Sequence, residues 1–340
     1  MSKLPKKINL ALQGGGAHGA FTWGVLDRLL EEDDLEIEGI SGTSAGAMNA
    51  VVLAEGMIDG GREGAKSALQ SFWWEISLLG SVFNPIRKTP TEKIEDPWNL
   101  DWSLSYTYHE LMSRILSPYQ SNPLNINPLK WILEKKLNFK KLCDSPIKLF
   151  IAATSVTTGR ARIFKHDEVT LDSLLASACI PFIFQAIKID DDYYWDGGYM
   201  GNPVLWPLIY KCSSEDILLI QINPIIRKEI PYTSNDIINR LNEITFNSSL
   251  IAEMRAINFV SRLIEKGKLS QDEYKDVKMH VIKQDTTHSD LNASSKLNTN
   301  WSFFQHLKNM GRHTTETWLN ENKKFISEKS SINIFDTFLK

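Results

Sequence analysis

The chain has 340 residues, of which 42% are apolar and 23% charged, a balance that excludes wholesale disorder and allows a large hydrophobic core. Its 38 Lys and Arg residues against 41 Asp and Glu residues leave no basic excess, so we expect no nucleic-acid partner. The three cysteines, Cys143, Cys179 and Cys212, lie far apart and match neither a disulfide framework nor a zinc site. They predict a reducing compartment, and we expect no metal and no cofactor.

The amino-terminal segment is the stretch that most resembles a signal peptide or a membrane span. Residues 1–7 are basic, and residues 8–26 contain no Asp, Glu, Lys or Arg. Five glycines interrupt this stretch, and the apolar run before them is too short to cross a bilayer. We therefore expect a cytoplasmic protein without a cleaved signal peptide, which touches a membrane only at its surface.

The first sixty residues alternate between strand and helix patterns. Residues 7–13 and 36–41 are expected to be strands. Residues 18–32 carry apolar side chains at helical spacing, and residues 45–58 are rich in Ala, Val, Leu and Met, so both predict helices. The alternation predicts the start of a mostly parallel α/β sheet flanked by helices.

Residues 72–131 differ in composition from the rest of the chain. They contain five of the ten tryptophans and many prolines, which predict an aromatic, loop-rich cap over the sheet. Trp73 and Trp74 follow apolar residues on a predicted helix, so we expect both rings in the core. Trp98 and Trp102 lie in a more polar stretch, where a cap that meets a membrane interface and a core position are both open.

The remainder of the chain continues the alternation. Residues 146–154 and 160–165 predict a hairpin, and the helix expected at 171–180 ends before Pro181. Residues 327–340 are expected to form a loosely held tail. Further strands are expected at residues 184–189, 216–223 and 277–283, and further helices at 235–266 and 303–325.

The first motif with chemical meaning lies between the first strand and the first helix. A glycine-rich turn at a helix amino terminus offers free N–H groups to an anion. The spacing also matches a dinucleotide-binding fingerprint, with Glu36 or Glu38 near the position that would bind a ribose, so an oxidoreductase stays open at this point. The motif consists of Gly14, Gly15, Gly16, Ala17, His18 and Gly19.

The second motif is typical of a nucleophile elbow, a sharp strand-to-helix turn that presents a serine hydroxyl. It comes directly after the second predicted strand and begins the second predicted helix. Short strings of this kind also arise by chance, as small-residue turns. The motif consists of Gly42, Thr43, Ser44, Ala45 and Gly46.

The third motif, Asp196-Gly197-Gly198, follows a predicted strand, and on its own it would be taken as an ordinary turn. A serine nucleophile needs a base, usually a histidine. The late histidines lie in no glycine-rich catalytic turn. An α/β-hydrolase would also place several strands before its nucleophile, whereas only two predicted strands precede Ser44. His288 is the best histidine among the four, which are His280, His288, His306 and His313.

Taken in order, the three motifs resemble the patatin-like phospholipase family. The segments 176–182 and 242–249 are similar to that family as well, and the likeness covers residues 7–320. The resemblance implies a Ser44–Asp196 dyad on an α/β sheet, with the turn formed by Gly14, Gly15 and Gly16 as the oxyanion hole. His18 is a departure, because the family commonly has Arg or Lys there.

The resemblance also implies an activity. We expect a lipid acyl hydrolase of the phospholipase A or lysophospholipase type, which cleaves phospholipid esters through an acyl-enzyme at a membrane surface. The alternative is acyl transfer or neutral-ester hydrolysis by the same residues. A dinucleotide-dependent oxidoreductase and an inactive scaffold are more distant alternatives. Burial and the acidic run Asp190–Asp192 are expected to raise the pKa of Asp196, because an ordinary Asp is too weak a base.

The same reading predicts the domain organisation. Residues 7–285 are expected to form the catalytic α/β domain, with residues 72–131 as a cap or insertion. Residues 286–340 are expected to add a carboxy-terminal helix and tail packed on that domain.

Overall fold

The computed structural model describes residues 5–86, 88–89, 92, 96–101, 103–227, 230–284 and 291–340, so Trp102 and His288 lie outside the described residues. One eight-stranded sheet has the order β5-β6-β3-β2-β1-β7-β8, and β4 pairs with β3 off this path. The strands are β1 (Lys6–Leu12), β2 (Leu35–Thr43), β3 (Lys148–Ser155), β4 (Ala161–Lys165), β5 (Ile187–Ile189), β6 (Asp192–Asp196), β7 (Asp216–Gln221) and β8 (Lys278–Lys283).

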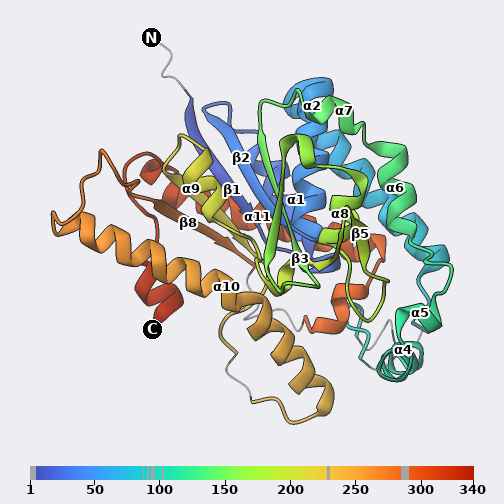
Figure 1. Ribbon diagram of the computed structural model, residues 1–340. Coiled ribbons are helices and arrows are strands. Elements are labelled where there is room, and N and C mark those ends of the chain that lie inside the picture. The colour runs from blue at the N-terminus through green and yellow to red at the C-terminus, as the bar shows by residue number, and fades with distance from the viewer. Residues whose placement is uncertain are drawn as a thin grey trace.

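Helices cover both faces of this sheet (Figure 1). The α-helices are α1 (Gly19–Leu29), α2 (Ala45–Phe83), α4 (Leu104–Ile115), α5 (Pro118–Ser121), α6 (Pro128–Lys136), α7 (Phe139–Leu142), α8 (Leu171–Ser177), α9 (Trp206–Lys211), α10 (Ser234–Glu265) and α11 (Trp301–Asn322). Short 3₁₀ helices are η1 (Gly16–His18), η2 (His166–Glu168), η3 (Gly197–Tyr199), η4 (Ala293–Leu297) and η5 (Lys323–Phe325), and η6 (Phe335–Leu339) is a π-helix.

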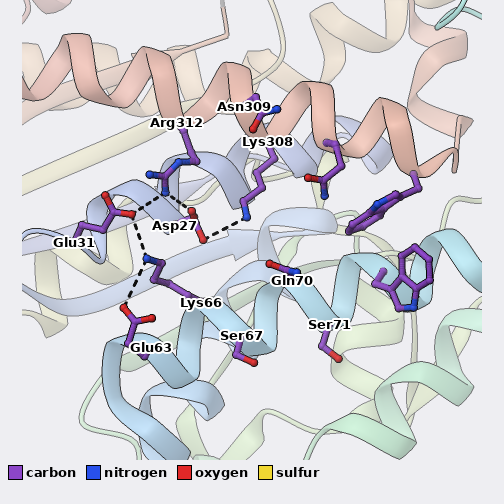
Figure 2. Close-up of a pocket in the computed structure, with 13 residues that line it drawn as sticks. Asp27, Glu31, Glu63, Lys66, Ser67, Gln70, Ser71, Lys308, Asn309 and Arg312 are labelled. Carbon is purple, nitrogen blue, oxygen red and sulfur yellow. Dashed lines mark hydrogen bonds and ion pairs between the residues drawn. The ribbon is translucent and has the colours of Figure 1, made fainter.

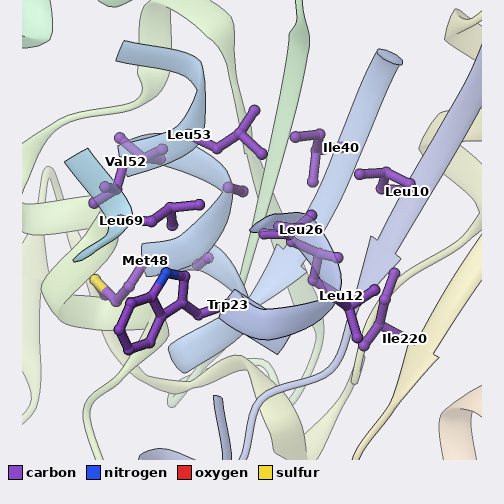
Figure 3. Close-up of a cluster of buried hydrophobic side chains, with 14 of the residues drawn as sticks. Leu10, Leu12, Trp23, Leu26, Ile40, Met48, Val52, Leu53, Leu69 and Ile220 are labelled. Atoms are coloured by element: carbon purple, nitrogen blue, oxygen red, sulfur yellow. The ribbon is translucent and has the colours of Figure 1, made fainter. Parts of the chain in front are cut away.

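The central strands are parallel and buried on both faces. β1 pairs in parallel with β2 on one side and with β7 on the other. β2 pairs in parallel with β3, and β7 pairs in parallel with β8. Leu10 and Leu12 point into the core beneath α1, α2 and α11 (Figure 3), whereas Ala11 points into the core beneath α9, α10 and η6. This alternation explains why the strands read as continuous apolar runs. The predicted α/β class with a mostly parallel sheet is confirmed.

The predicted hairpin of β3 and β4 and the long helix α10 are present, whereas one strand and the packing of the tail differ from the prediction. β6 pairs antiparallel with β5 and β3, so the segment before Asp196 is a hairpin rather than a single strand. The tail is not loosely held. Ile334 and Phe338 are buried, and the N–H of Ser331 donates to the carbonyl of Met279 in β8.

The predicted cap is more helical than expected. α2 continues beyond a kink at Gly60 and Gly61 to Phe83, and α4, α5 and α6 follow within residues 104–136. α4 was not predicted, although its apolar residues recur at helical spacing, because the prolines and tryptophans of residues 72–131 indicate loops. Figure 1 shows α4 at the periphery of the molecule, away from the sheet.

The tryptophans of this region divide between core and surface. Trp73 is buried as expected, but Trp74 is 48% exposed. Trp98 is half-buried, and its ring stacks on Phe303 and His306 with centroid separations of 5.3 and 5.2 Å. Trp98 therefore packs against α11, and the membrane-cap interpretation does not hold for it.

Ion pairs join α11 to α1 and α2 along the wall of a cavity of about 860 Å³ (Figure 2). Lys308 and Arg312 of α11 both pair with Asp27, and Arg312 also reaches Glu31 at 2.9 Å. Lys66 of α2 contacts the same Glu31 at 3.1 Å. Each of these three cations already has a carboxylate partner, so the network serves to hold α11 in place.

Two glycines allow α1 and α11 to pack backbone against backbone. A Cβ atom on Gly24 would lie 2.0 Å from the carbonyl oxygen of Lys308, and one on Gly311 would lie 2.2 Å from that of Phe21. Side chains at these positions would force the two helices apart. The close contact positions α11, and through it the segment that precedes α11.

We expect Gly311→Ala to lower the free energy of unfolding by about 1–3 kcal/mol, because a rigid carbonyl cannot yield as a side chain would. Gly60→Ala is the matched control, since no atom lies within 4 Å of its Cβ position. Thermal and denaturant unfolding of the two variants provide the measurement. Equal stability of both variants would contradict this account of helix packing.

Candidate active site

Ser44 and Asp196 meet because β2 and β6 end at neighbouring positions on β3. Thr43, the last residue of β2, pairs with Ala152, and Asp196, the last residue of β6, pairs with Ala153. The two strands approach each other from opposite directions, since β2 is parallel to β3 and β6 is antiparallel. Residues 152 positions apart in the sequence are thereby placed side by side.

Ser44 occupies a strained turn. Its φ of 53° and ψ of −121° are unfavourable for a residue with a side chain, and such strain commonly costs about 1–3 kcal/mol. The neighbouring glycine is required by close approach, because a Cβ on Gly46 would lie 2.2 Å from the carbonyl oxygen of Leu12. The Ser44 N–H donates to the Ser177 hydroxyl at 2.9 Å. The turn thus has the sharp strand-to-helix geometry that a nucleophile elbow requires.

Asp196 is buried and lies beside the serine. Its carboxyl accepts a hydrogen bond from the N–H of Gly198 at 2.7 Å, and the Ser44 hydroxyl is near enough to favour its ionised form. Burial raises the pKa of Asp196 to about 6, although the Gly198 N–H and the Ser44 hydroxyl oppose that rise. An aspartate with this pKa is a much better proton acceptor than an ordinary one.

The acidic run beside Asp196 does not cause this shift. Asp192 lies at the start of β6, and its carboxylate accepts hydrogen bonds from the hydroxyls of Ser155 and Thr157. These bonds lower the pKa of Asp192 itself. The expectation that residues 190–192 raise the pKa of Asp196 is therefore wrong, and burial of the carboxyl is the cause.

The glycine turn abuts Ser44, but its first N–H is already occupied. A Cβ on Gly14 would lie 2.7 Å from the Cβ of Ser44, which shows how closely the turn approaches the serine. The N–H of Gly14 donates to Oδ1 of Asn202 at 2.6 Å. Within the described part of the chain, the N–H groups of Gly15 and Gly16 have no such acceptor. Two of the three expected donors therefore remain open for an oxyanion.

Comparison with known proteins identifies the family of this chain. Residues 10–209, well over half of the chain, match the description "Patatin-like phospholipase". The chain belongs to the patatin-like phospholipase family. The predicted resemblance is thus confirmed.

Two relatives carry the name cGAMP-activated phospholipase. The protein from Escherichia coli (strain TW11681) is 28% identical over 221 residues, and the one from Pseudomonas aeruginosa (strain BWHPSA011 / Pa011) is 24% identical over 216 residues. The alignments cover 58% and 59% of this chain, but 53% and 55% of the relatives. The chain therefore spans about half the length of these two proteins.

Solved structures show more distant likeness. The ExoU–SpcU heterodimer from the type III secretion system of Pseudomonas aeruginosa is 17% identical with a TM-score of 0.40, covering 95% of this chain and 52% of that one. VipD from Legionella pneumophila is 14% identical with a TM-score of 0.39, covering 91% and 67%.

His18, the position where this patatin-like chain departs from the usual motif, is a buried and neutral side chain. Its Nε2 lies 2.7 Å from the hydroxyl of Ser295 in η4. Burial, followed by repulsion from Lys296 and Arg227, lowers the pKa of His18 to about 3. The imidazole therefore carries no charge at neutral pH and instead ties η4 to the glycine turn.

No histidine in the described part of the chain hydrogen-bonds to Ser44 or Asp196. His280 pairs with Asp216 at 2.9 Å, toward the amino ends of β7 and β8, whereas Ser44 follows the carboxyl end of β2. His306 stacks on Trp98, and His313 is exposed. His288 lies outside the described residues.

The ribose-binding position of a dinucleotide site is not formed. Glu36 and Glu38 lie near the start of β2, level with Lys7 and Ile8 of β1, whereas the glycine turn follows the far end of β1. Four to six strand residues separate them from the turn, roughly 13–20 Å. Glu38 is also occupied by the N–H groups of Ser213 and Ser214. The geometry argues against the oxidoreductase alternative.

Two polar residues of the site carried no recognised role in the sequence. Ser177 binds the Ser44 N–H, and Asn202 binds the Gly14 N–H, each from a distant segment. Asn202 lies just after the Asp-Gly-Gly motif, so its proximity to Asp196 was a usable signal. Ser177 lies in the predicted helix before Pro181, and nothing local distinguishes it from a helix-packing serine.

The glycine turn predicts different outcomes for two substitutions. A Cβ on Gly15 would meet the flexible end of Ile222, whereas one on Gly16 would meet the Lys296 carbonyl at 2.5 Å from a backbone with φ of +58°. We expect Gly15→Ala to reduce turnover of a soluble ester about tenfold or more with little change in melting temperature, because the added methyl group moves the Gly15 N–H from its place at the oxyanion while the flexible end of Ile222 can yield.

Gly16→Ala is expected to lower the melting temperature as well as turnover. Melting curves and steady-state kinetics of both variants decide the matter. Wild-type turnover by Gly15→Ala, or micromolar binding of NAD or FAD at this turn, would remove the turn from the oxyanion site.

The raised pKa of Asp196 predicts a pH dependence. Ester hydrolysis should fall about tenfold per pH unit below about 6, because the base must be ionised. The same shift means that the folded protein favours protonated Asp196. The stability that protonated Asp196 contributes is complete below the unfolded pKa of 3.8 and is lost as pH rises through about 6. Asp196→Asn should therefore melt higher than wild type at pH 8, with the difference vanishing near pH 4. If the two proteins differ in melting temperature by the same amount at both pH values, burial does not raise the pKa of Asp196.

Proposed function

We propose that this chain is a lipid acyl hydrolase of the phospholipase A or lysophospholipase type, in which Ser44 is the nucleophile and Asp196 its base. The observation that carries the proposal is the Ser44 hydroxyl beside a buried aspartate of raised pKa, next to a turn in which two N–H groups have no acceptor among the described residues. The family and the names of the two relatives support the same activity.

The mechanism follows from these positions. The Ser44 oxygen attacks the ester carbonyl carbon while its proton passes to Asp196. The negative charge that forms on the carbonyl oxygen is stabilised by the N–H groups of Gly15 and Gly16. The ester C–O bond then breaks, and Asp196 returns the proton to the departing alcohol, leaving an acyl-serine. Water, deprotonated by Asp196, releases the fatty acid and restores Ser44.

Acyl transfer to an alcohol would use the same residues, with the acceptor hydroxyl in place of water. Analysis of the products with and without added glycerol separates the two reactions. Both named relatives are cGAMP-activated, so each assay is to be run with and without cGAMP.

We further propose that α4 contacts the membrane that holds the substrate. Four residues at helical spacing form its apolar stripe, Leu104, Tyr108, Leu111 and Ile115, which are 84%, 67%, 56% and 65% exposed. A stripe of this size on a peripheral helix is costly in water and suits an interfacial helix. No helix in the described part of the chain combines the length and apolar character that crossing a bilayer requires.

The dyad predicts that Ser44→Ala and Asp196→Asn each reduce acyl release from phospholipid vesicles by a thousandfold or more while the fold is kept, as removal of a nucleophile or its base typically does. Acyl release with chromatographic product analysis and circular dichroism provide the measurements. A fluorophosphonate probe should label wild type but not Ser44→Ala. Wild-type-like turnover by Asp196→Asn would exclude the aspartate base and return attention to His288.

The apolar stripe predicts a substrate-dependent defect. Leu104→Gln with Ile115→Gln should weaken vesicle sedimentation and long-chain hydrolysis several-fold, because each side chain loses apolar burial in the interface. Hydrolysis of a short soluble ester should be unaffected. Leu124→Gln, an exposed apolar residue outside the stripe at 81%, serves as the control. Equal loss on both substrates would show that α4 supports the fold instead.

A further inference from the structure

Lys296 is a shielded lysine that forms no ion pair with a carboxylate of the described residues. It lies in η4, most of its side chain is shielded from solvent, and its ammonium donates to Oδ1 of Asn223 at 2.8 Å. No carboxylate of the described residues lies within ion-pair distance of it. Burial, with repulsion from Arg227, lowers its pKa to about 8 against the attraction of Glu243. Burying a charge whose hydrogen-bond partner is neutral is costly, and such groups cluster at binding sites.

This lysine borders the far end of the glycine turn. The Lys296 carbonyl oxygen lies 2.5 Å from the Cβ position of Gly16, whereas Ser44 abuts Gly14 at the other end. Asn223, which accepts from the ammonium, also donates its Nδ2 to the Gly14 carbonyl at 2.7 Å. The Lys296 backbone therefore contacts the Gly16 end of the turn, while Asn223 holds the ammonium beside the turn.

The surroundings carry more positive than negative charge. Arg227 and Arg240 share the single carboxylate of Glu243, at 2.7 and 3.0 Å, on the wall of a cavity of about 310 Å³. Asp236, at the start of α10, also borders that cavity and accepts from a nearby hydroxyl. Among the described residues of this cluster, the three cations, Lys296 included, exceed the two carboxylates, so an added anion would balance them.

We propose that Lys296 binds the phosphate of a glycerophospholipid substrate and so determines the preference for phospholipids over uncharged esters. The inference rests on the proposed ester hydrolysis at Ser44. A phospholipid carries its phosphate on the same glycerol as the ester, so an ester at Ser44 places the phosphate one glycerol away. Of the lipid's parts, the phosphate is the permanent anion, and it can supply the oxygens that the ammonium lacks.

The first test compares two lipids that differ only in the phosphate headgroup. Phosphatidylglycerol and diacylglycerol with identical acyl chains are presented in the same detergent micelles to wild type and to Lys296→Met. We expect kcat/KM for phosphatidylglycerol to fall at least tenfold, mainly through KM, because the phosphate loses a charge-assisted hydrogen bond. The loss on diacylglycerol should be at least fivefold smaller. Lys296→Arg should restore most of the phospholipid activity.

The matched control is Lys266→Met, which removes an exposed lysine at the end of α10 and changes net charge equally. It should leave the ratio between the two lipids as in wild type. The melting temperature of Lys296→Met should stay level or rise, since a costly charge is removed. Equal losses on both lipids, or a fall in melting temperature with them, would overturn the proposal.

A binding experiment separates this inference from the proposed activity. In a Ser44→Ala background, the Kd for soluble dihexanoyl phosphatidylglycerol, followed by tryptophan fluorescence, should rise at least tenfold on Lys296→Met. The Kd for dihexanoylglycerol should change far less. If wild type hydrolyses neither lipid yet this difference appears, the proposed function fails and the phosphate site stands. An unchanged Kd, or Lys296-dependent binding of inorganic phosphate as tight as that of the lipid, would overturn the lipid phosphate site.

Discussion

The meeting of β2 and β6 on β3 is the constraint on which the rest of the site depends. It brings backbones so close that side chains are excluded at the contacts. A Cβ on Gly197 would lie 2.2 Å from the carbonyl oxygen of Ala152, and one on Gly14 would lie 2.7 Å from that of Thr43. Gly46 likewise faces Leu12. The three glycine-containing motifs are therefore parts of one contact, and each glycine permits an approach between motifs as much as a local turn.

This mutual packing explains how far the sequence could predict the site. Ser44, Asp196 and the glycine turn lie in local patterns with unusual residue types, so a linear reading detects them. Asn202 and Ser177 act through single hydrogen bonds to backbone N–H groups that the chain reaches only after folding. A short-range pattern contains no information about such pairings. The acidic run misled for a related reason, because proximity in sequence placed Asp192 near Asp196 while the strand directed its carboxylate to Ser155 and Thr157.

The fold shows the same division. Central strands and long helices were predictable, because burial on one or two faces produces a regular pattern of apolar residues in the sequence. α4 was missed because the prolines and tryptophans on either side of it indicate loops, although its own apolar residues recur at helical spacing. The tail was misjudged because its two core residues, Ile334 and Phe338, fill a space made by α10 and β8 rather than by neighbouring residues.

Burial also sets the charge state of the site in one consistent direction. It raises the pKa of Asp196 to about 6 and lowers those of His18 and Lys296 to about 3 and 8, so each group is moved toward its neutral form. For Asp196 the result suits its proposed role as a base near neutral pH. His18 becomes a neutral tether for η4, which carries Lys296.

A phospholipid offers three chemically distinct parts to such a surface. In the arrangement proposed here, the ester meets the paired Ser44 and Asp196, the phosphate meets Lys296, and the apolar stripe of α4 engages the bilayer from which the acyl chains come. Only the phosphate contact requires a charged lipid. The preference for phospholipid would then depend on η4, a segment outside the three motifs, so two chains with identical motifs could differ in substrate through this segment alone.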